Sequence, residues 1–76
     1  MSGKLPSVTP DQLLRALHRD GWSERRRSGS HIILVHDQKP GRVVVLYHWD
    51  KEIKPGTLAS IIAQAGLSRE EFRRLL

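Results

Sequence analysis

Residues 31–48 read HIILVHDQKPGRVVVLYH, and this stretch decides the fold of the 76-residue chain. Two apolar runs, 31–36 and 43–48, flank residues 37–41, whose Asp, Pro and Gly are typical of turns. The runs are rich in β-branched residues, so we predict two antiparallel strands. Both alternating positions of each run are apolar, which predicts a helical layer on one sheet face and a partly apolar surface on the other.

The segments before this hairpin predict a third strand and a helix. Residues 22–27 alternate as a strand does, and residues 28–30 are a turn signal, so the sheet is expected to be a three-stranded antiparallel meander. Residues 9–12, Thr-Pro-Asp-Gln, combine an N-cap hydroxyl, a Pro at the first helical position and a capping-box Gln. A helix therefore begins here, with an apolar stripe made by Leu13, Leu14 and Leu17.

Two further helices are expected after the hairpin. Residues 54–57, Lys-Pro-Gly-Thr, open the first, whose buried stripe is Leu58, Ile61, Ile62 and Ala65. Residues 68–71 form a capping box for a short last helix, with Phe72 and either Leu75 or Leu76 turned inward. The fold class is α+β, in the order helix, three strands, helix, short helix. We expect one domain over residues 1–76, frayed over residues 1–7.

Composition points to a basic protein of a reducing compartment. The chain has no Cys, and its formal net charge is +5. No apolar stretch is long enough to cross a membrane, and no hydrophobic stretch follows the first residues as in a signal peptide. We expect a cytoplasmic protein with no membrane association. The sequence pI near 10.5 favours a polyanionic partner such as RNA, DNA or an acidic protein surface.

The residues best suited to catalysis surround the start of the second strand. Gly29-Ser30-His31 follows the basic run Arg25-Arg26-Arg27. An imidazole can give and take protons near neutrality, and guanidinium groups bind phosphates, so this combination suits phosphodiester chemistry. If the first strand is regular, Arg26 points away from Arg25 and Arg27. We expect His31 to be catalytic, and RNA to be bound by Arg25, Arg26, Arg27, Ser30, Lys51 and Lys54.

His48 is a candidate catalytic partner for His31, and the hairpin register decides whether it can act. In one register His31 lies directly opposite His48; in a register slipped by one residue it faces Tyr47, and His48 points to the other side. His36 projects from the opposite face of a regular strand and is a poor partner. These three histidines have no Asp or Cys at suitable spacing, so no metal site is expected.

The chain resembles the HicA toxins of bacterial toxin-antitoxin pairs over nearly its whole length after Ser7. The resemblance is carried in order by Gly21-Trp22, Gly29-Ser30-His31, Pro40-Gly41-Arg42 with the Val run, His48, Lys54-Pro55-Gly56-Thr57-Leu58, Ile61, Gln64-Ala65-Gly66-Leu67 and Glu70-Glu71-Phe72. The resemblance implies a fold similar to the double-stranded-RNA-binding domain and an mRNA-cleaving ribonuclease restrained by a HicB antitoxin. The family's single catalytic His follows Gly-Ser or Gly-Gly, which corresponds to His31.

The chain departs from the family pattern in two places. After His36 the chain has Asp37-Gln38 where the family often has Pro-Asp, and Leu46-Tyr47-His48-Trp49 lacks the Pro that often precedes the later His. The first change is a turn variation. The second places a bulky side chain beside His48, which alters the substrate surface or the antitoxin contact. We expect Trp22 to be a core anchor, while Trp49 suits base stacking and burial about equally.

The function expected from these observations is that of the toxin of a type II toxin-antitoxin system. It would cleave mRNA without metal or cofactor, with His31 as the essential acid or base. A HicB-like antitoxin would cover the His31 face, and DNA would be contacted only through that antitoxin. Two alternatives stay open: a non-catalytic RNA-binding module of similar fold, and a protein-interaction domain that uses its apolar sheet face and Trp49.

Overall fold

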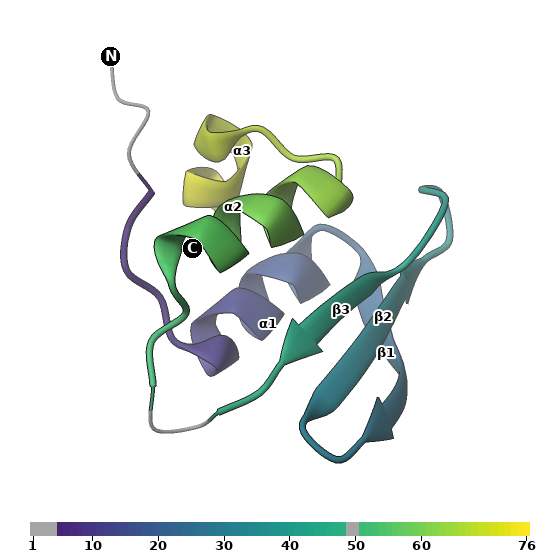
Figure 1. The fold of residues 1–76 in the computed structure, drawn as a ribbon. Helices are drawn as coiled ribbons and strands as arrows, with labels where there is room; N and C mark the ends of the chain where they lie inside the picture. Colours follow the sequence, from purple (N-terminus) through teal and green to yellow (C-terminus); the bar gives the residue numbers. More distant parts are fainter. Residues whose placement is uncertain (1–4, 49–50) are drawn as a thin grey trace.

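The computed structural model describes residues 5–48 and 51–76. Three helices and three strands follow one another in the predicted order (Figure 1): α1 Pro10–Arg19, β1 Trp22–Ser28, β2 His31–His36, β3 Val43–Leu46, α2 Pro55–Gln64 and α3 Arg69–Leu75. The α+β prediction is therefore confirmed.

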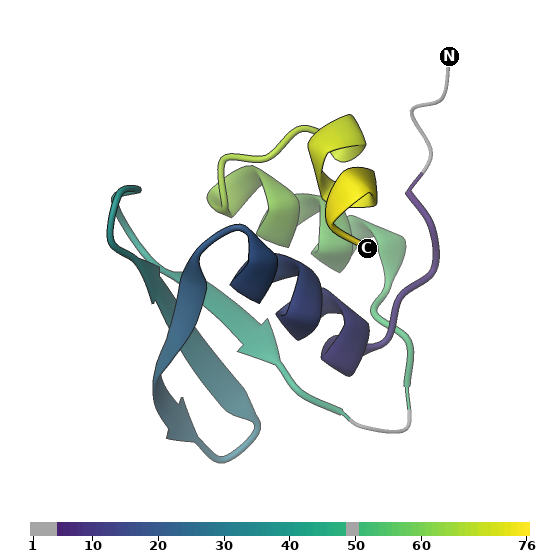
Figure 2. The same cartoon turned by 180° about the vertical axis from the view of Figure 1, so that it is seen from behind.

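The three strands form one antiparallel sheet in the order β1-β2-β3. All three helices lie on one side of this sheet, as the two opposite views show (Figures 1 and 2). We call the side turned away from the helices the open face. It carries the alternate apolar side chains of β2 and β3, of which Val44 and Leu46 are 40% and 45% exposed. The prediction of one covered and one partly apolar face is confirmed.

The helix starts follow the predicted capping chemistry. The Thr9 hydroxyl accepts from the Gln12 N–H at 3.2 Å, and the Gln12 side chain accepts from the Thr9 N–H at 2.8 Å. Ser68 and Glu71 form the same reciprocal pair at the start of α3. Each pair satisfies two N–H groups that the helix itself leaves without partners, which fixes where the helix begins.

The core lies between the helices and the covered sheet face. The buried apolar residues are Val8, Leu13, Ala16, Leu17, Trp22, Ile32, Leu34, Val43, Val45, Leu58, Ile61, Ile62, Ala65 and Phe72. The predicted stripe of α2 and the inward Phe72 are confirmed, as is the burial of Trp22. In α3 it is Leu75 that packs against the core, while Leu76 is 44% exposed. Arg19 of α1 donates a hydrogen bond to the Leu75 carbonyl and so ties α3 to α1.

The β2–β3 register differs from both predicted registers. His31 lies opposite Leu46, and β3 ends there rather than at His48. Ile32 and Leu34 of β2 pair with Val45 and Val43, and all four are fully buried against the helices. Both faces of each strand are apolar, so alternation alone does not fix the register.

β1 contains a bulge at Arg25, so the predicted alternation holds for Arg26 and Arg27 but not for Arg25. The register shifts between Glu24 and Arg26, so Arg25 is an extra residue in β1. After the bulge, Arg26 pairs with Ile33 and Arg27 with Ile32. An inserted residue re-aims the side chains that follow it. Arg26 therefore lies on the open face, and Arg27 on the covered side.

His36 has a structural role at the junction of α1, β1 and β2. Its Nδ1 accepts from the Gln38 N–H at 2.9 Å, so Nε2 carries the proton and donates to the Asp20 carbonyl at 2.6 Å. The ring packs edge-on against Trp22 at 5.2 Å between centroids. Gly21 has φ of +106°, and a Cβ there would lie 2.5 Å from the His36 ring nitrogen. This close approach explains why glycine follows α1.

Lys39 joins the ends of two helices. Its ammonium group donates to the Asp20 carboxylate at 2.6 Å and to the Ala65 carbonyl, at the end of α2, at 2.9 Å. The same Asp20 carboxylate accepts from the Trp22 indole at 3.1 Å. Lys39 therefore neutralises a half-buried carboxylate and caps a helix whose last carbonyls lack helical partners.

Within residues 5–48 and 51–76, no helix is long and apolar enough to cross a membrane.

Candidate functional site

His31 is the first residue of β2 and is exposed on the open face. It directly follows the two-residue turn Gly29-Ser30, in which Gly29 has φ of +58°, as the first position of a type II′ hairpin turn requires. The Ser30 carbonyl accepts from the Tyr47 N–H at 2.7 Å, which ties the turn to the end of β3. The cross-strand neighbours of His31 are Ser28 and Leu46, neither of which is ionisable. The imidazole is therefore held by rigid backbone and open to a large ligand.

Two of the three predicted phosphate-binding arginines share the face of His31. Arg25 and Arg26 line a shallow hollow together with Ile33, Val35 and Arg42. The bulge brings Arg25 and Arg26 to the same hollow although they are neighbours in sequence. No helix covers this side of the sheet (Figure 2). The lining of the hollow therefore combines three arginines with the apolar side chains of Ile33 and Val35 on a face that solvent reaches.

Arg27 belongs to a different environment. Its guanidinium forms an ion pair with Glu24 at 3.1 Å and lies 5.7 Å from the centre of the Tyr47 ring. The hydrogen bond to Glu24 raises the pKa of Arg27, so its charge is permanent but already compensated. Tyr47 in turn donates to Asp11 of α1 at 2.9 Å, and this bond raises the pKa of the Tyr47 hydroxyl. Arg27 thus stands apart from His31, on the covered side of the sheet.

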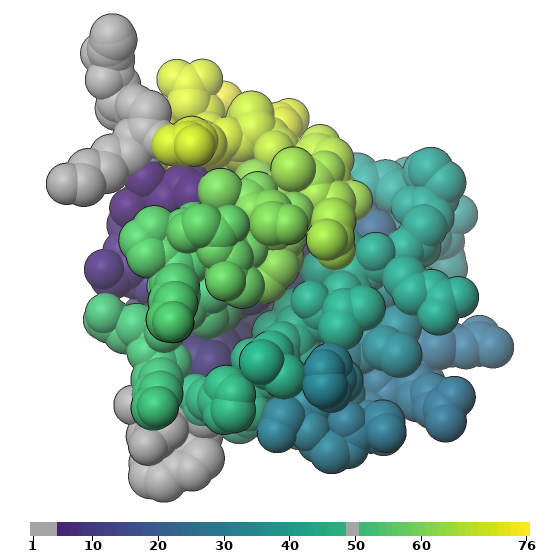
Figure 3. Space-filling view, in the orientation of Figure 1, coloured from purple at the N-terminus to yellow at the C-terminus, as the bar shows by residue number. Residues whose placement is uncertain are grey.

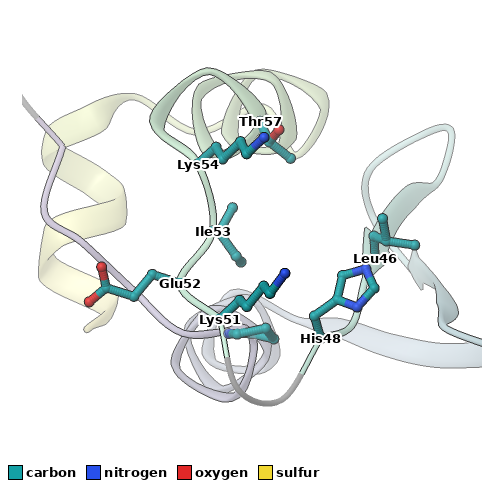
Figure 4. Close-up of a pocket in the computed structure, with 8 residues that line it drawn as sticks. Leu46, His48, Lys51, Glu52, Ile53, Lys54 and Thr57 are labelled. Carbon is teal, nitrogen blue, oxygen red and sulfur yellow. The ribbon is translucent and has the colours of Figure 1, made fainter.

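Three other predicted site residues, His48, Lys51 and Lys54, line a cleft at the end of β3, with a volume of about 350 Å³. The residues that line this cleft are Pro10, Leu46, His48, Lys51, Glu52, Ile53, Lys54 and Thr57. Figure 4 shows His48 and Lys51 on one side of the opening, Lys54 and Thr57 across from them, and the Glu52 carboxylate directed away. Figure 3 shows the start of α2 in green and the end of β3 in teal on one face of the molecule.

His48 lies two residues beyond Leu46, the partner of His31, and past the end of β3. It therefore does not face His31 across a strand pair, as one predicted register required. Instead, His48 and Leu46 both line the cleft. His36 is engaged by Asp20 and Gln38 and lies on the covered face, as predicted. Trp49, predicted to stack or to contact a partner, lies outside the described residues.

Sequence reasoning missed two parts of this arrangement. Arg42 completes the hollow with Arg25 and Arg26, because the β2–β3 hairpin returns it beside them. Ile53 and Thr57 join the cleft, and the spacing of Lys51 and Lys54 around Ile53 was the only sequence signal for it. Among the described side chains, no three His, Asp or Glu residues come together in a way that could hold a metal ion.

Comparison with known protein families gives a match. The matching family is described as "HicA toxin of bacterial toxin-antitoxin", and the match covers residues 10–67. This span runs from the start of α1 to just before α3. No curated protein matches the chain. The matched span includes the Gly29-Ser30-His31 turn, the open face and the cleft.

Proposed function

Because the chain belongs to the HicA toxin family of bacterial toxin-antitoxin systems, we propose that it is an endoribonuclease that cleaves mRNA with His31 as an essential acid or base. At the family level, such a toxin implies an RNA target and a HicB antitoxin partner. The observation that carries the proposal is the exposed His31 imidazole, which begins β2 on the same face as Arg26.

The proposed reaction is internal attack by the 2′-hydroxyl of the RNA on the adjacent phosphorus. A base takes the 2′-hydroxyl proton, the 2′-oxygen bonds to phosphorus, and the 5′-oxygen leaves after receiving a proton from an acid. The products are a 2′,3′-cyclic phosphate and a free 5′-hydroxyl. His31 carries out one of the two proton transfers. Arg26, and Arg25 beside it, suit the negative charge that builds up on the phosphate oxygens.

The second proton transfer requires another group, because one imidazole does not serve as both acid and base within one step. His48, a lysine or water can fill this role, and His48 lines the cleft next to Leu46, the residue opposite His31. The pH profile of cleavage distinguishes these choices. If His48 takes part, His48→Ala removes one limb of the bell-shaped profile; if it only binds RNA, both limbs stay and KM rises.

The open face is also the surface that we propose for the antitoxin. It exposes Val44 and Leu46 beside His31, and the hollow with Arg25 and Arg26 gives it positive charge. An apolar patch surrounded by arginines fits a partner that offers apolar and acidic side chains. An antitoxin bound there would bury His31 and so block RNA.

An RNA with a single 2′-deoxyribose at the scissile position tests the proposed chemistry. The wild-type protein should cut the all-RNA substrate and leave the deoxy substrate intact, since the nucleophile is missing. Undiminished cleavage of the deoxy substrate would refute attack by the 2′-hydroxyl. If the protein binds both substrates with a steep salt dependence and yields no product from either, the RNA-binding module becomes the better description.

A further inference from the structure

The cleft at the end of β3 combines positive charge with apolar walls. Lys51 and Lys54 bring ammonium groups to its two sides, and His48 adds a ring. The Glu52 carboxylate points away from the opening (Figure 4), so it does not neutralise the lysines inside the cleft. A ligand that satisfies this site therefore carries negative charge on one part and a flat or apolar surface on another.

The apolar part of the cleft comes from Pro10, Leu46 and Ile53. Ile53 packs against the protein core, and its N–H donates to the Val8 carbonyl at 2.9 Å, so this wall is fixed in place. The volume of the cleft, about 350 Å³, lies at the lower end of the range for small-molecule sites. The cleft is thus sized for a compact group and too small for a nucleic-acid duplex.

The position of the cleft relates it to His31. Leu46 is the cross-strand partner of His31 and also lines the cleft. One side chain therefore separates the two features. Both His31 and the cleft adjoin Leu46, as neighbouring positions along one bound RNA strand would require.

We propose that this cleft binds the nucleotide next to the scissile phosphate of single-stranded RNA. Lys51 and Lys54 hold the phosphate of that neighbouring nucleotide. Its base lies against Leu46, Ile53 and the His48 ring. Bases in single strands are commonly recognised by stacking and apolar contact, while lysines supply the backbone contacts. The assignment of the scissile phosphate to His31 rests on the proposed function, but binding of a nucleotide by the cleft does not require cleavage.

Alanine variants of the two lysines test this site, with Arg74→Ala as a control for the loss of one positive charge. Arg74 is exposed on α3 and does not line the cleft. Binding of a short fluorescein-labelled single-stranded RNA is measured at several salt concentrations, with His31→Ala in every protein so that no cleavage occurs. Each lysine variant should bind about five- to tenfold more weakly, with a salt dependence smaller by about one ion, and Arg74→Ala should match the parent.

A second measurement tests the base. Adenosine and cytidine monophosphates are titrated into the isotopically labelled full chain, and inorganic phosphate serves as the comparison. The backbone signals of Ile53 and Thr57 should shift with the nucleotides and move much less with phosphate. Equal shifts with phosphate would overturn the assignment of a base-binding wall.

The outcomes separate this inference from the proposed function. Equal weakening by Lys51→Ala, Lys54→Ala and Arg74→Ala would overturn the cleft site, since only overall charge would matter. Unchanged RNA binding by both lysine variants, with weakened antitoxin binding instead, would also overturn it. A wild-type protein that cuts no RNA, yet binds it through both lysines, would reject the proposed function and support the cleft.

Discussion

His31 and Leu46 lie directly opposite each other at the end of the β2–β3 pair. Leu46 also lines the cleft that contains Lys51 and Lys54. Arg26 of β1, which pairs with Ile33 of β2, lies on the same sheet face as His31. His31 is therefore located between a hollow with three arginines and a cleft with two lysines. The exposed imidazole therefore has basic surfaces on two sides.

The alternation of β1 after its bulge predicts different roles for two neighbouring arginines. Arg26→Ala should reduce RNA cleavage by about tenfold or more, because it removes a guanidinium from the face of His31. Arg27→Ala removes the same charge from the covered side, where Glu24 already compensates it, and should change cleavage by less than about threefold. Initial rates on one RNA substrate compare the two variants. Equal losses of activity would contradict the separate roles argued from the placement of Arg26 and Arg27 on opposite sides of the sheet.

Gly21 should be far less tolerant of a side chain than Gly29. Gly21→Ala forces a Cβ to within 2.5 Å of the His36 ring at a φ of +106°, so both backbone strain and the His36–Asp20 hydrogen bond are affected. We expect a loss of about 2–4 kcal/mol in the free energy of unfolding. Gly29→Ala has φ of +58° and nothing within 4 Å of the added Cβ, so only about 1–2 kcal/mol is lost.

Urea denaturation followed by circular dichroism measures both glycine variants. A Gly21→Ala protein as stable as Gly29→Ala would contradict the close packing of His36 on the end of α1.

The capping box of α3 makes stability depend on pH on the acid side. The Ser68 N–H donates to Glu71, and this bond holds the pKa of the Glu71 carboxyl below its ordinary value of 4.5. A lowered pKa in the folded state means that the stabilisation is present above about pH 4.5 and is lost as the pH falls through the folded-state pKa.

Glu71→Gln keeps an acceptor oxygen and removes the titration. The free energy of unfolding of the wild type should exceed that of the variant at about pH 6, and this difference should shrink toward about pH 3. A difference that stays constant over this range would show that the Glu71 charge does not contribute.

The open face should be required for binding of the antitoxin. Val44→Asp places a charge in the middle of the exposed apolar patch and should weaken the complex by about tenfold or more. Ala63→Asp introduces the same group at an exposed position of α2, on the side of the sheet that carries the helices, and should bind normally. Isothermal titration with the purified antitoxin measures both. If only Ala63→Asp weakened the complex, the antitoxin would bind the helices instead.

The elements themselves could be predicted from sequence because their signals are local. Thr9 with Gln12, and Ser68 with Glu71, specify helix starts through bonds between residues three apart. Gly29 likewise marks a two-residue turn. These patterns predict the order of the elements and place His31 at the start of the second strand.

The relative placement of the site residues could not be predicted in the same way. Residues 32–35 and 43–45 are apolar on both faces, so a shift in pairing by one residue places no polar side chain in the core. Both predicted registers were wrong, because His31 pairs with Leu46. The bulge at Arg25 lies among exposed polar residues, where no apolar pattern reveals an insertion. The contact of Lys39 with Asp20 and Ala65 depends on tertiary structure alone.

The catalytic role of His31 is tested by the rate at which purified protein cleaves RNA in single-turnover experiments. His31→Ala should lower that rate by about 10²- to 10⁴-fold while its circular dichroism spectrum stays unchanged. His18→Ala, which removes an exposed histidine from α1, should cleave at the wild-type rate. A His31→Ala protein that cleaves RNA as fast as the wild type would rule out a catalytic role for His31.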